Sequence, residues 1–410
     1  MKNSKNITTK KTETCVGIAD RAKSAKASAT LAISARVDEM RQQGQRIINF
    51  TIGEPDFNTP DYIIDAAKKA LDEGKTKYTA TAGLFKLRAA ICEKLKRDNG
   101  LEYDIHQIVV SNGAKQALFN AVMALVNPGD EVIIPAPYWV TYPELVKLAG
   151  GVPVFVQTDE SEGFKMSAAA LKNAITGKTK AVIINSPNNP TGAVYSQAEL
   201  GKLAAVIESA GIWVISDEIY EALIYPNCSN TNEKNWSIAK YSDELFKRTV
   251  IVNGFSKTYS MTGWRIGYSA CCAELSRAME NIQSHVTSNI NTMTQYAALQ
   301  ALSDEKGENF RKQMVAEFDK RRKYMTMRLS TLPFVAFTVP QGAFYVLVNV
   351  ARLGNGDDVA AGLLEKAKIA VVPGAAFGAP DYIRLCYTVS IDDIKAGMDS
   401  LESYLNGLKY

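Results

Sequence analysis

The chain has 410 residues, of which 46% are hydrophobic and 22% are charged, and its formal net charge is +4. This composition is typical of soluble globular proteins, and the length predicts two or three domains with a core that needs no disulfide or metal. No apolar run approaches the ~18 residues of a membrane-spanning helix, the N-terminus lacks the apolar segment of a signal peptide, and the charge is too small to indicate nucleic-acid binding. We therefore expect a cytoplasmic protein without a membrane or nucleic-acid partner.

The six cysteines and two histidines indicate that neither disulfides nor a metal carries the chemistry of this protein. No two cysteines form a C-x-x-C pair, and six cysteines in a chain of this length are not a disulfide scaffold. The two histidines, His106 and His285, are isolated and do not make a zinc site. We expect free thiols, no metal, and proton transfer by Lys, Asp, Glu or Tyr.

In chain order, the first predicted element is a flexible arm at residues 1–27, which are rich in Lys, Asn, Thr and Ser. From about residue 60, short Ile- and Val-rich runs alternate with helical patterns, as in an α/β sheet buried between helices. The apolar residues between 117 and 125, for example, recur at helical spacing. The predicted strands are Ile108–Val110, Val132–Ile134, Ala181–Ile184, Ile212–Ile215 and Thr249–Val252.

A charged stretch that begins near Glu305 predicts a long solvated helix and a domain boundary. Beyond it, Ala343–Val350 and Tyr382–Val389 predict shorter strands of an α+β unit. The expected fold is therefore α/β, with a large domain at residues 53–309 built on a central, mostly parallel sheet between helices. Residues 28–52 and 310–410 are expected to form a smaller α+β domain.

Ligands of open α/β sheets bind beyond the carboxyl ends of the strands, so the residues that follow each strand are candidates for a site. After the first strand, Gly113 opens a helix whose N-terminus favours an anion such as phosphate. Lys115 in the first turn of that helix opposes the helix dipole, which a nearby anion would relieve. A solvated surface lysine explains Lys115 equally well.

Three further strands are followed by polar residues. The segment Asn185–Gly192 is a rigid turn with two prolines, and Asp217 is either a site carboxylate or a helix cap. Lys257 follows the last strand at the edge of a buried sheet, where a lowered pKa would suit a Schiff-base lysine. Each signal is weak alone, but together they predict one crevice with phosphate-binding, acid, phenol and amine groups.

Five motifs together are specific for a known family. They are Gly53–Phe57, Asn188–Gly192, Asp217–Tyr220, Ser256–Lys257 with Arg265 eight residues on, and Pro373–Gly378. From about Ser28 to Arg384 the chain resembles the fold-type I, pyridoxal-phosphate-dependent aminotransferases of the aspartate aminotransferase class. The resemblance implies pyridoxal 5′-phosphate as the cofactor and a ping-pong reaction that passes through pyridoxamine phosphate.

The resemblance also assigns roles to the crevice residues. Lys257 would bind the cofactor and shuttle the proton, Asp217 would pair with the pyridine nitrogen, and Trp139 would stack on the ring. Tyr220 and Asn189 would hydrogen-bond the phenolate oxygen of the ring. The phosphate would be bound by Gly113, Ala114, Lys115, Ser256, Arg265 and a Tyr78 that reaches over from the neighbouring subunit, which implies a homodimer. The chain departs from some relatives at Gly254, where a phosphate-binding serine is common.

The substrate carboxylate would be held by Arg384, which faces away from its apolar neighbours Ile383 and Leu385 on the predicted strand. By resemblance it clamps the α-carboxylate, and Gly53, Trp139, Asn189 and Phe377 would also contact the substrate. Without the resemblance, a structural ion pair is the more natural interpretation of Arg384.

The motifs are closest to the gamma subgroup of aspartate aminotransferases, in which a lysine at the position of Lys115 and the hydroxyls of Ser28 and Thr30 would bind the distal carboxylate. This implies aspartate and glutamate as amino donors, with their 2-oxo acids as acceptors. The sequence leaves open whether prephenate is also an acceptor. It also leaves open an aromatic or other amino acid aminotransferase, a lyase of the same fold, and a sensor that has kept the fold.

Overall fold

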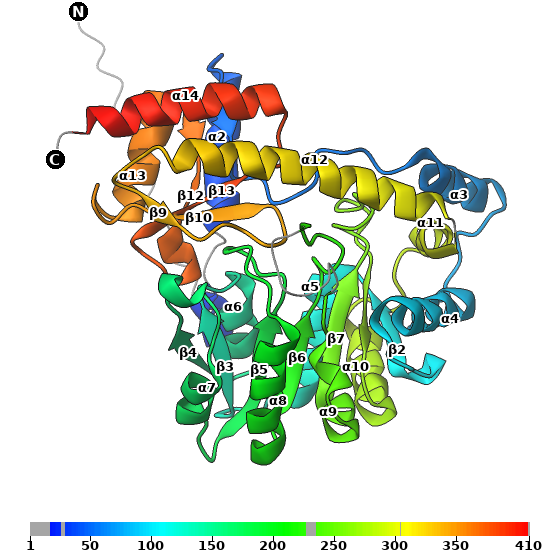
Figure 1. The fold of residues 1–410 in the computed structure, drawn as a ribbon. Coiled ribbons are helices and arrows are strands. Elements are labelled where there is room, and N and C mark those ends of the chain that lie inside the picture. The colour runs from blue at the N-terminus through cyan, green and yellow to red at the C-terminus, as the bar shows by residue number, and fades with distance from the viewer. Residues whose placement is uncertain (1–16, 26–28, 227–234, 304, 409–410) are drawn as a thin grey trace, which may run out of the picture.

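The computed structural model describes residues 17–25, 29–226, 235–303 and 305–408. They build a larger sheet flanked by helices and, at one end of it, smaller sheets with their own helices (Figure 1). The α-helices are α1 (Asp20–Ser24), α2 (Ala29–Gln42), α3 (Asp61–Asp72), α4 (Phe85–Lys94), α5 (Gly113–Leu125), α6 (Thr141–Leu148), α7 (Ala168–Ala174), α8 (Gln197–Ala210), α9 (Asp243–Arg248), α10 (Ala273–Val286), α11 (Thr292–Ser303), α12 (Lys306–Leu329), α13 (Gly356–Gly362) and α14 (Ile391–Gly407). The strands are β1 (Ile48–Asn49), β2 (Ile108–Ser111), β3 (Glu131–Ala136), β4 (Val152–Gln157), β5 (Thr179–Asn185), β6 (Trp213–Asp217), β7 (Thr249–Gly254), β8 (Gly267–Ala270), β9 (Ala336–Phe337), β10 (Tyr345–Asn349), β11 (Ile369–Ala370), β12 (Val372–Pro373) and β13 (Tyr382–Cys386).

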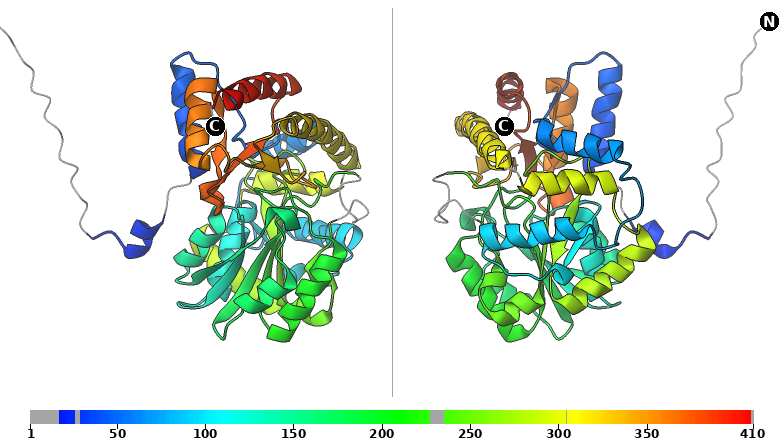
Figure 2. Two further views of the ribbon diagram at one scale, coloured as in Figure 1. Left: turned by 60° about the vertical axis from the view of Figure 1, so that its left-hand side comes forward. Right: turned by 90° about the vertical axis from the view of Figure 1, so that its right-hand side faces the viewer.

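The larger sheet has seven strands in the order β2-β8-β7-β6-β5-β3-β4. All neighbours are parallel except β8, which is antiparallel to both β2 and β7. Helices α5, α6 and α10 pack on one face of the sheet, and α7, α8 and α9 pack on the other, so that helices cover both sides (Figure 2). The prediction of a mostly parallel sheet between helices is confirmed.

All five predicted strands of this region lie within or overlap observed strands, because Ile and Val suit strands that are buried on both faces. Two strands were not predicted. Strand β4 lies at the sheet edge, where Val152 and Phe155 are exposed and Pro153 interrupts the pattern. Strand β8 has the sequence Gly-Tyr-Ser-Ala, which contains no Ile or Val. Burial of β8 between two neighbours, rather than its own propensity, makes it a strand.

The smaller sheets lie against the helices α2, α12, α13 and α14 (Figure 1). One is antiparallel, with the order β12-β13-β10-β9, and the other pairs β1 with β11. The predicted long helix is confirmed as α12, which continues across the predicted boundary at residue 309. It is less solvated than expected, because Met314, Phe318 and Met325 are fully buried in the core of this end of the molecule.

Several predictions fall outside or at the edge of the described residues. Of the predicted arm, residues 1–16, 26 and 27 are not described, and Asp20–Ser24 forms the short helix α1. Among the described residues, no helix is long and apolar enough to span a membrane, and no group of three or more potential ligands is placed to hold a metal ion.

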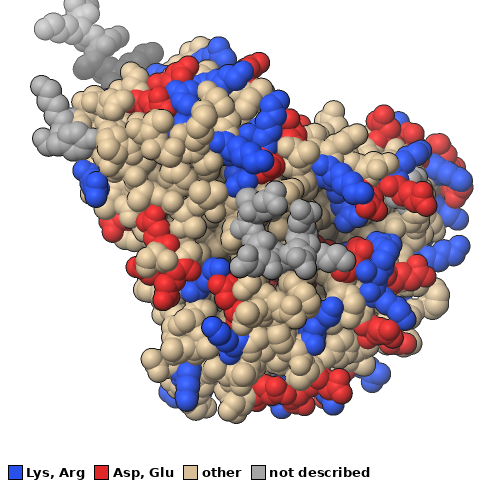
Figure 3. All heavy atoms as spheres, in the orientation of Figure 1, with Lys and Arg blue, Asp and Glu red and all other residues tan. Residues whose placement is uncertain are grey.

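The four described cysteines are free thiols, and two of them are buried. Acidic and basic side chains are mixed over the described face in Figure 3, as a small net charge leads one to expect.

Candidate active site

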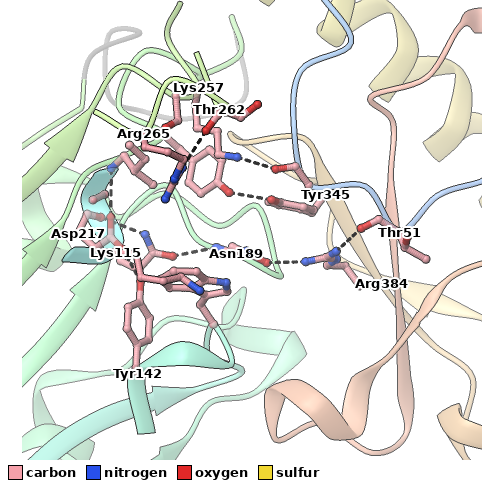
Figure 4. Close-up of a pocket in the computed structure, with 17 residues that line it drawn as sticks. Thr51, Lys115, Tyr142, Asn189, Asp217, Lys257, Thr262, Arg265, Tyr345 and Arg384 are labelled. Atoms are coloured by element: carbon pink, nitrogen blue, oxygen red, sulfur yellow. Dashed lines mark hydrogen bonds between the residues drawn. The ribbon is translucent and has the colours of Figure 1, made fainter. Parts of the chain in front are cut away.

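The carboxyl ends of β5 and β6 open onto a cavity of about 290 Å³ that is closed on its other side by β10 and β13. Its place agrees with the rule that open α/β sheets bind ligands at the carboxyl ends of their strands. Eleven residues predicted from the sequence line this cavity (Figure 4): Gly53, Ala114, Lys115, Trp139, Asn189, Asp217, Tyr220, Ser256, Lys257, Arg265 and Arg384. The structure therefore brings together groups from positions more than three hundred residues apart.

Asp217, the last residue of β6, supplies a buried carboxylate. The hydroxyl of Tyr142 donates to its Oδ2 at 2.7 Å, and the backbone N–H of Ile219 donates to its Oδ1 at 3.2 Å. Burial raises the pKa of Asp217 to about 6, although both hydrogen bonds and the nearby Lys257 act in the opposite direction. A cationic or N–H group in the cavity would stabilise the ionised carboxylate further.

Asn189 connects the two sides of the cavity (Figure 4). Its backbone N–H donates to Oδ1 of Asn185 at 2.9 Å, and Asn185 in turn donates to the backbone carbonyl of Asp217 at 3.0 Å. On the other side, Nη1 of Arg384 donates to Oδ1 of Asn189 at 3.0 Å. One hydrogen-bonded chain therefore runs from the end of β6 to strand β13.

Arg384 is a buried cation whose geometry leaves room for a further partner. Its Nη2 donates to the carbonyl of Thr51 at 2.8 Å, and its Cζ lies over the rings of Tyr345 and Phe377, 4.5 and 5.0 Å from their centroids. Its Nε is buried and has no hydrogen-bond partner among the described residues. Because a guanidinium presents N–H groups in a fork that matches a carboxylate, this arrangement is suited to an anionic substrate.

Lys257 follows β7 and points its amine into the cavity, where Nζ donates to the carbonyl of Gly53 at 2.6 Å. Removal from water lowers the pKa of Lys257 to about 8, while the carboxylate of Glu54 opposes this shift. A substantial fraction of the amine is then neutral near physiological pH, which nucleophilic and base catalysis require.

An anion-binding end is formed where helix α5 begins. Gly113 has a φ of 77°, and a Cβ on it would lie 2.8 Å from Nη2 of Arg265, so this position needs glycine. Arg265 is held by donating from Nη1 to the carbonyl of Thr262 at 2.8 Å. Lys115 lies above the Trp139 ring, 4.9 Å from its centroid, and partial burial and Arg265 lower its pKa. A helix N-terminus flanked by two cations favours a phosphate or carboxylate.

Some predicted site residues lie elsewhere. Gly113 does not line the cavity but lies next to Arg265, and Phe377 is fully buried and contacts Arg384 with its ring. Tyr78 is 91% exposed and does not line the cavity of its own chain. Ser28 lies outside the described residues, as does the side chain of Thr30, so the predicted pair of hydroxyls stays a prediction.

Sequence reasoning missed six lining residues: Thr51, Tyr142, Asn185, Ile219, Thr262 and Tyr345. Three of them carried a usable signal, because Tyr142 is three positions after Trp139, Asn185 directly follows the predicted strand Ala181–Ile184, and Ile219 lies within the motif Asp217–Tyr220. Tyr345 carried none. It lies on β10, outside the five motifs, and it meets Tyr220 only through the fold, with the two hydroxyl oxygens 2.7 Å apart.

A mostly parallel sheet that gathers a buried carboxylate, an amine and two arginines around one cavity is the arrangement of the fold-type I aminotransferases. The model of the family described as aminotransferase class I and II matches residues 45–401, and the chain belongs to this family. The predicted family, fold type and enzyme class are therefore confirmed.

Relatives with named activities resemble nearly the whole chain. It is 46% identical to a probable aspartate/prephenate aminotransferase of Aquifex aeolicus over 95% of this chain and 98% of that one. It is also 46% identical to an aspartate aminotransferase of Geobacillus stearothermophilus, with the same coverage of both chains. Among solved structures, the aspartate aminotransferase of Thermus thermophilus with maleate superposes with a TM-score of 0.91 at 39% identity, covering 95% of this chain and 99% of the other.

Proposed function

We propose that this chain is a pyridoxal-phosphate-dependent aspartate aminotransferase that exchanges amino groups between aspartate and 2-oxoglutarate. The observation that carries the proposal is that Asp217 and Lys257 line one cavity, with an acid of raised pKa and an amine of lowered pKa. Residues with shifted pKa values in a cavity are typical of catalytic sites.

The residues of the cavity match pyridoxal phosphate group by group. The buried carboxylate of Asp217 suits the ring nitrogen, and the indole of Trp139 offers a flat apolar face. Tyr220 and Asn189 provide polar groups for the ring oxygen. The start of α5 with Arg265 suits the phosphate, and the space next to Gly113 has no room for a Cβ. The donor set therefore fits both charges of the cofactor and its ring.

When bound, the cofactor supplies an electron sink that stabilises negative charge at the substrate Cα. Asp217, held by Tyr142, keeps a proton on the ring nitrogen because an adjacent carboxylate favours the charged form. Lys257 accepts the proton from the substrate Cα and returns it, since its lowered pKa allows both states near neutral pH. The carbonyl of Gly53 orients the amine of Lys257 by accepting its hydrogen bond.

Two cationic positions support a diacid substrate. Arg384, with its unpaired Nε, binds the α-carboxylate, and Lys115 at the other end of the cavity binds the distal carboxylate. The charged neighbour of Lys115 is another cation, Arg265, so an anionic ligand relieves their repulsion. The names of the relatives support aspartate as the amino donor, and those named for prephenate support it as a second acceptor.

The enzyme acts as a homodimer in the cytoplasm. The exposed ring of Tyr78 is free to reach a second copy of the chain, where it completes the phosphate site. Free cysteines are what a reducing compartment favours. Residues 53–309, which include the larger sheet, form the cofactor-binding domain. Residues 28–52 and 310–410 form a smaller domain that closes over the substrate.

The test is an absorbance spectrum of the purified protein before and after aspartate is added alone. The proposal expects a bound-cofactor band that shifts on adding aspartate, release of oxaloacetate, and recovery of the band on adding 2-oxoglutarate. Repeating the recovery with prephenate tests the second acceptor. Lys257→Ala should abolish the release of oxaloacetate while the protein still binds the cofactor non-covalently, and normal turnover of that variant would contradict the mechanism.

A lyase of the same fold is the second candidate, because lyases use the same acid and amine. The spectrum separates the two reactions, since a lyase turns over without a 2-oxo acid acceptor. Turnover with aspartate alone, many times per protein molecule, would exclude the aminotransferase.

A further inference from the structure

Tyr345 contacts both ends of the catalytic cavity, although no motif includes it. It lies on β10, its side chain is 1% exposed, and it lines the cavity. Its hydroxyl oxygen is 2.7 Å from that of Tyr220, and the face of its ring lies 4.5 Å from Cζ of Arg384. It therefore touches one residue expected at the cofactor and one expected at the substrate.

The direction of the hydroxyl contact follows from counting protons. The two phenols share a single hydrogen bond, so one of them donates and the other accepts. If Tyr220 directs its proton to an acceptor in the cavity, Tyr345 must be the donor. Burial raises the pKa of Tyr220, and donation from Tyr345 opposes this shift, which makes Tyr220 a stronger donor in turn.

The ring of Tyr345 serves a different residue. The guanidinium of Arg384 contacts the rings of both Tyr345 and Phe377, and its hydrogen bonds go to Asn189 and Thr51. Cation–π contact with a buried guanidinium is favourable and fixes its plane. Because Arg384 lines the cavity, the plane of its guanidinium decides which N–H groups face a carboxylate there.

We propose that Tyr345 is a positioning residue with two separable roles: its hydroxyl orients the proton of Tyr220 toward the cofactor, and its ring holds Arg384 for the substrate carboxylate. This inference rests on the proposed function of the same cavity. The charged or titratable groups that face Tyr220 are Tyr345, Arg384, Asp217, Cys386, Lys257 and Tyr142.

Tyr345→Phe tests the hydroxyl and keeps the ring. A hydrogen bond donated to the ring oxygen of the cofactor favours the deprotonated state of that oxygen. If loss of the Tyr345 hydroxyl weakens donation from Tyr220, the pH midpoint of the absorbance change of the bound cofactor should rise. We expect the midpoint to rise by about 0.3–1 pH unit, the size of one neutral hydrogen bond. Binding of a non-reacting dicarboxylate such as maleate, measured by calorimetry on the holoenzyme, should stay within about twofold, because the aromatic ring remains.

Tyr345→Leu removes the ring as well. The midpoint should rise as in Tyr345→Phe, and the dissociation constant for maleate should increase by about 3- to 30-fold, because Arg384 loses one face of its aromatic support. If Tyr345→Leu does not fold, Tyr345→Met makes the same comparison.

The matched controls are Tyr387→Phe and Tyr387→Leu. Tyr387 is fully buried on the same side of the molecule and donates weakly to the carbonyl of Ala343, but it does not line the cavity. Both controls should leave the midpoint and the maleate affinity unchanged.

Each half of the inference has its own contrary result. An unchanged midpoint in Tyr345→Phe overturns the role of the hydroxyl. Equal losses of maleate affinity in Tyr345→Phe and Tyr345→Leu, or in Tyr345→Leu and Tyr387→Leu, overturn the role of the ring. A wild-type protein that binds no cofactor refutes the proposed function itself. A wild-type protein that binds the cofactor, with Tyr345 variants whose midpoint and maleate affinity equal those of the wild type, refutes only the role of Tyr345.

Discussion

The hydroxyl of Tyr142 donates a 2.7 Å hydrogen bond to Oδ2 of Asp217, and both side chains are buried. Burial and the neighbouring carboxylate raise the pKa of Tyr142 well above its usual value, so its proton stays in place as a fixed donor. The same bond lowers the pKa of Asp217, which burial raises to about 6. Tyr142 therefore widens the pH range over which Asp217 is ionised.

Tyr142→Phe should raise the pKa of Asp217 by about one unit. A hydrogen bond to a charged group is worth roughly 1.5–3 kcal/mol, and other donors to Asp217 replace part of that energy. If Asp217 pairs with the ring nitrogen as proposed, only its ionised form holds the cofactor, so as the pH is lowered the cofactor affinity should begin to fall at a higher pH than in the wild type. A titration of cofactor binding between pH 5 and 8 measures this. Tyr195→Phe, a buried tyrosine outside the cavity, is the control, and identical profiles for Tyr142→Phe and the wild type would refute the coupling.

Lys115→Ala should discriminate between amino donors. If Lys115 binds the distal carboxylate, the KM for aspartate should rise by about 10- to 100-fold, the size of one charge-assisted hydrogen bond. An aromatic donor should lose far less, and Lys115→Arg, which keeps the cation, should retain part of the affinity for aspartate. Steady-state kinetics with the two donors measures this, and equal losses for both would mean that Lys115 serves only the phosphate.

Gly53→Ala should disturb Tyr345. A Cβ on Gly53 would lie 2.8 Å from the Tyr345 hydroxyl oxygen, so one of the two groups must move. Overpacking of this kind costs about 1–3 kcal/mol, so we expect kcat/KM for aspartate to fall about tenfold or more. Gly177→Ala is the control, because a Cβ there has no neighbour within 4 Å.

The Gly53→Ala effect should shrink when Tyr345→Phe is also present, because the clashing atom is then gone. Additive losses in the double variant would show that the damage arises elsewhere, for example at the carbonyl of Gly53 that accepts the hydrogen bond from Lys257.

Glu218→Gln should change how stability depends on pH. Glu218 is buried beside Asp217, and burial, followed by the charge of Glu221, raises its pKa to about 7. Its folded-state pKa lies above the unfolded value, so the stability it contributes is complete below about pH 4.5 and is lost as the pH rises through 7.

Relative to Glu218→Gln, the wild type should lose roughly 2–4 kcal/mol of unfolding free energy between pH 5 and 8. Urea unfolding of both proteins at several pH values measures this difference. A constant difference across that range would mean that Glu218 keeps the same protonation state in the folded and unfolded chain.

The sequence by itself predicted the chemical groups of the site and most of the strands that position them. Ile- and Val-rich runs predicted the central strands, because such residues suit strands covered on both faces. The residues that follow those strands, among them Asp217 and Lys257, were predicted to share one crevice, because parallel strands end at the same edge. Local motifs were sufficient here since each group is placed by its own strand.

Only the tertiary structure decided what supports those groups. Tyr142 is bound to Asp217 across 75 positions and Tyr345 to Tyr220 across 125, and neither pair has a sequence spacing that predicts contact. Arg384 is positioned by Thr51, 333 residues earlier. The pKa values of Asp217 and Lys257 are likewise set by burial, which depends on how the two sheets close on the cavity. A side chain's type is local, but its partners and its distance from water are properties of the whole fold.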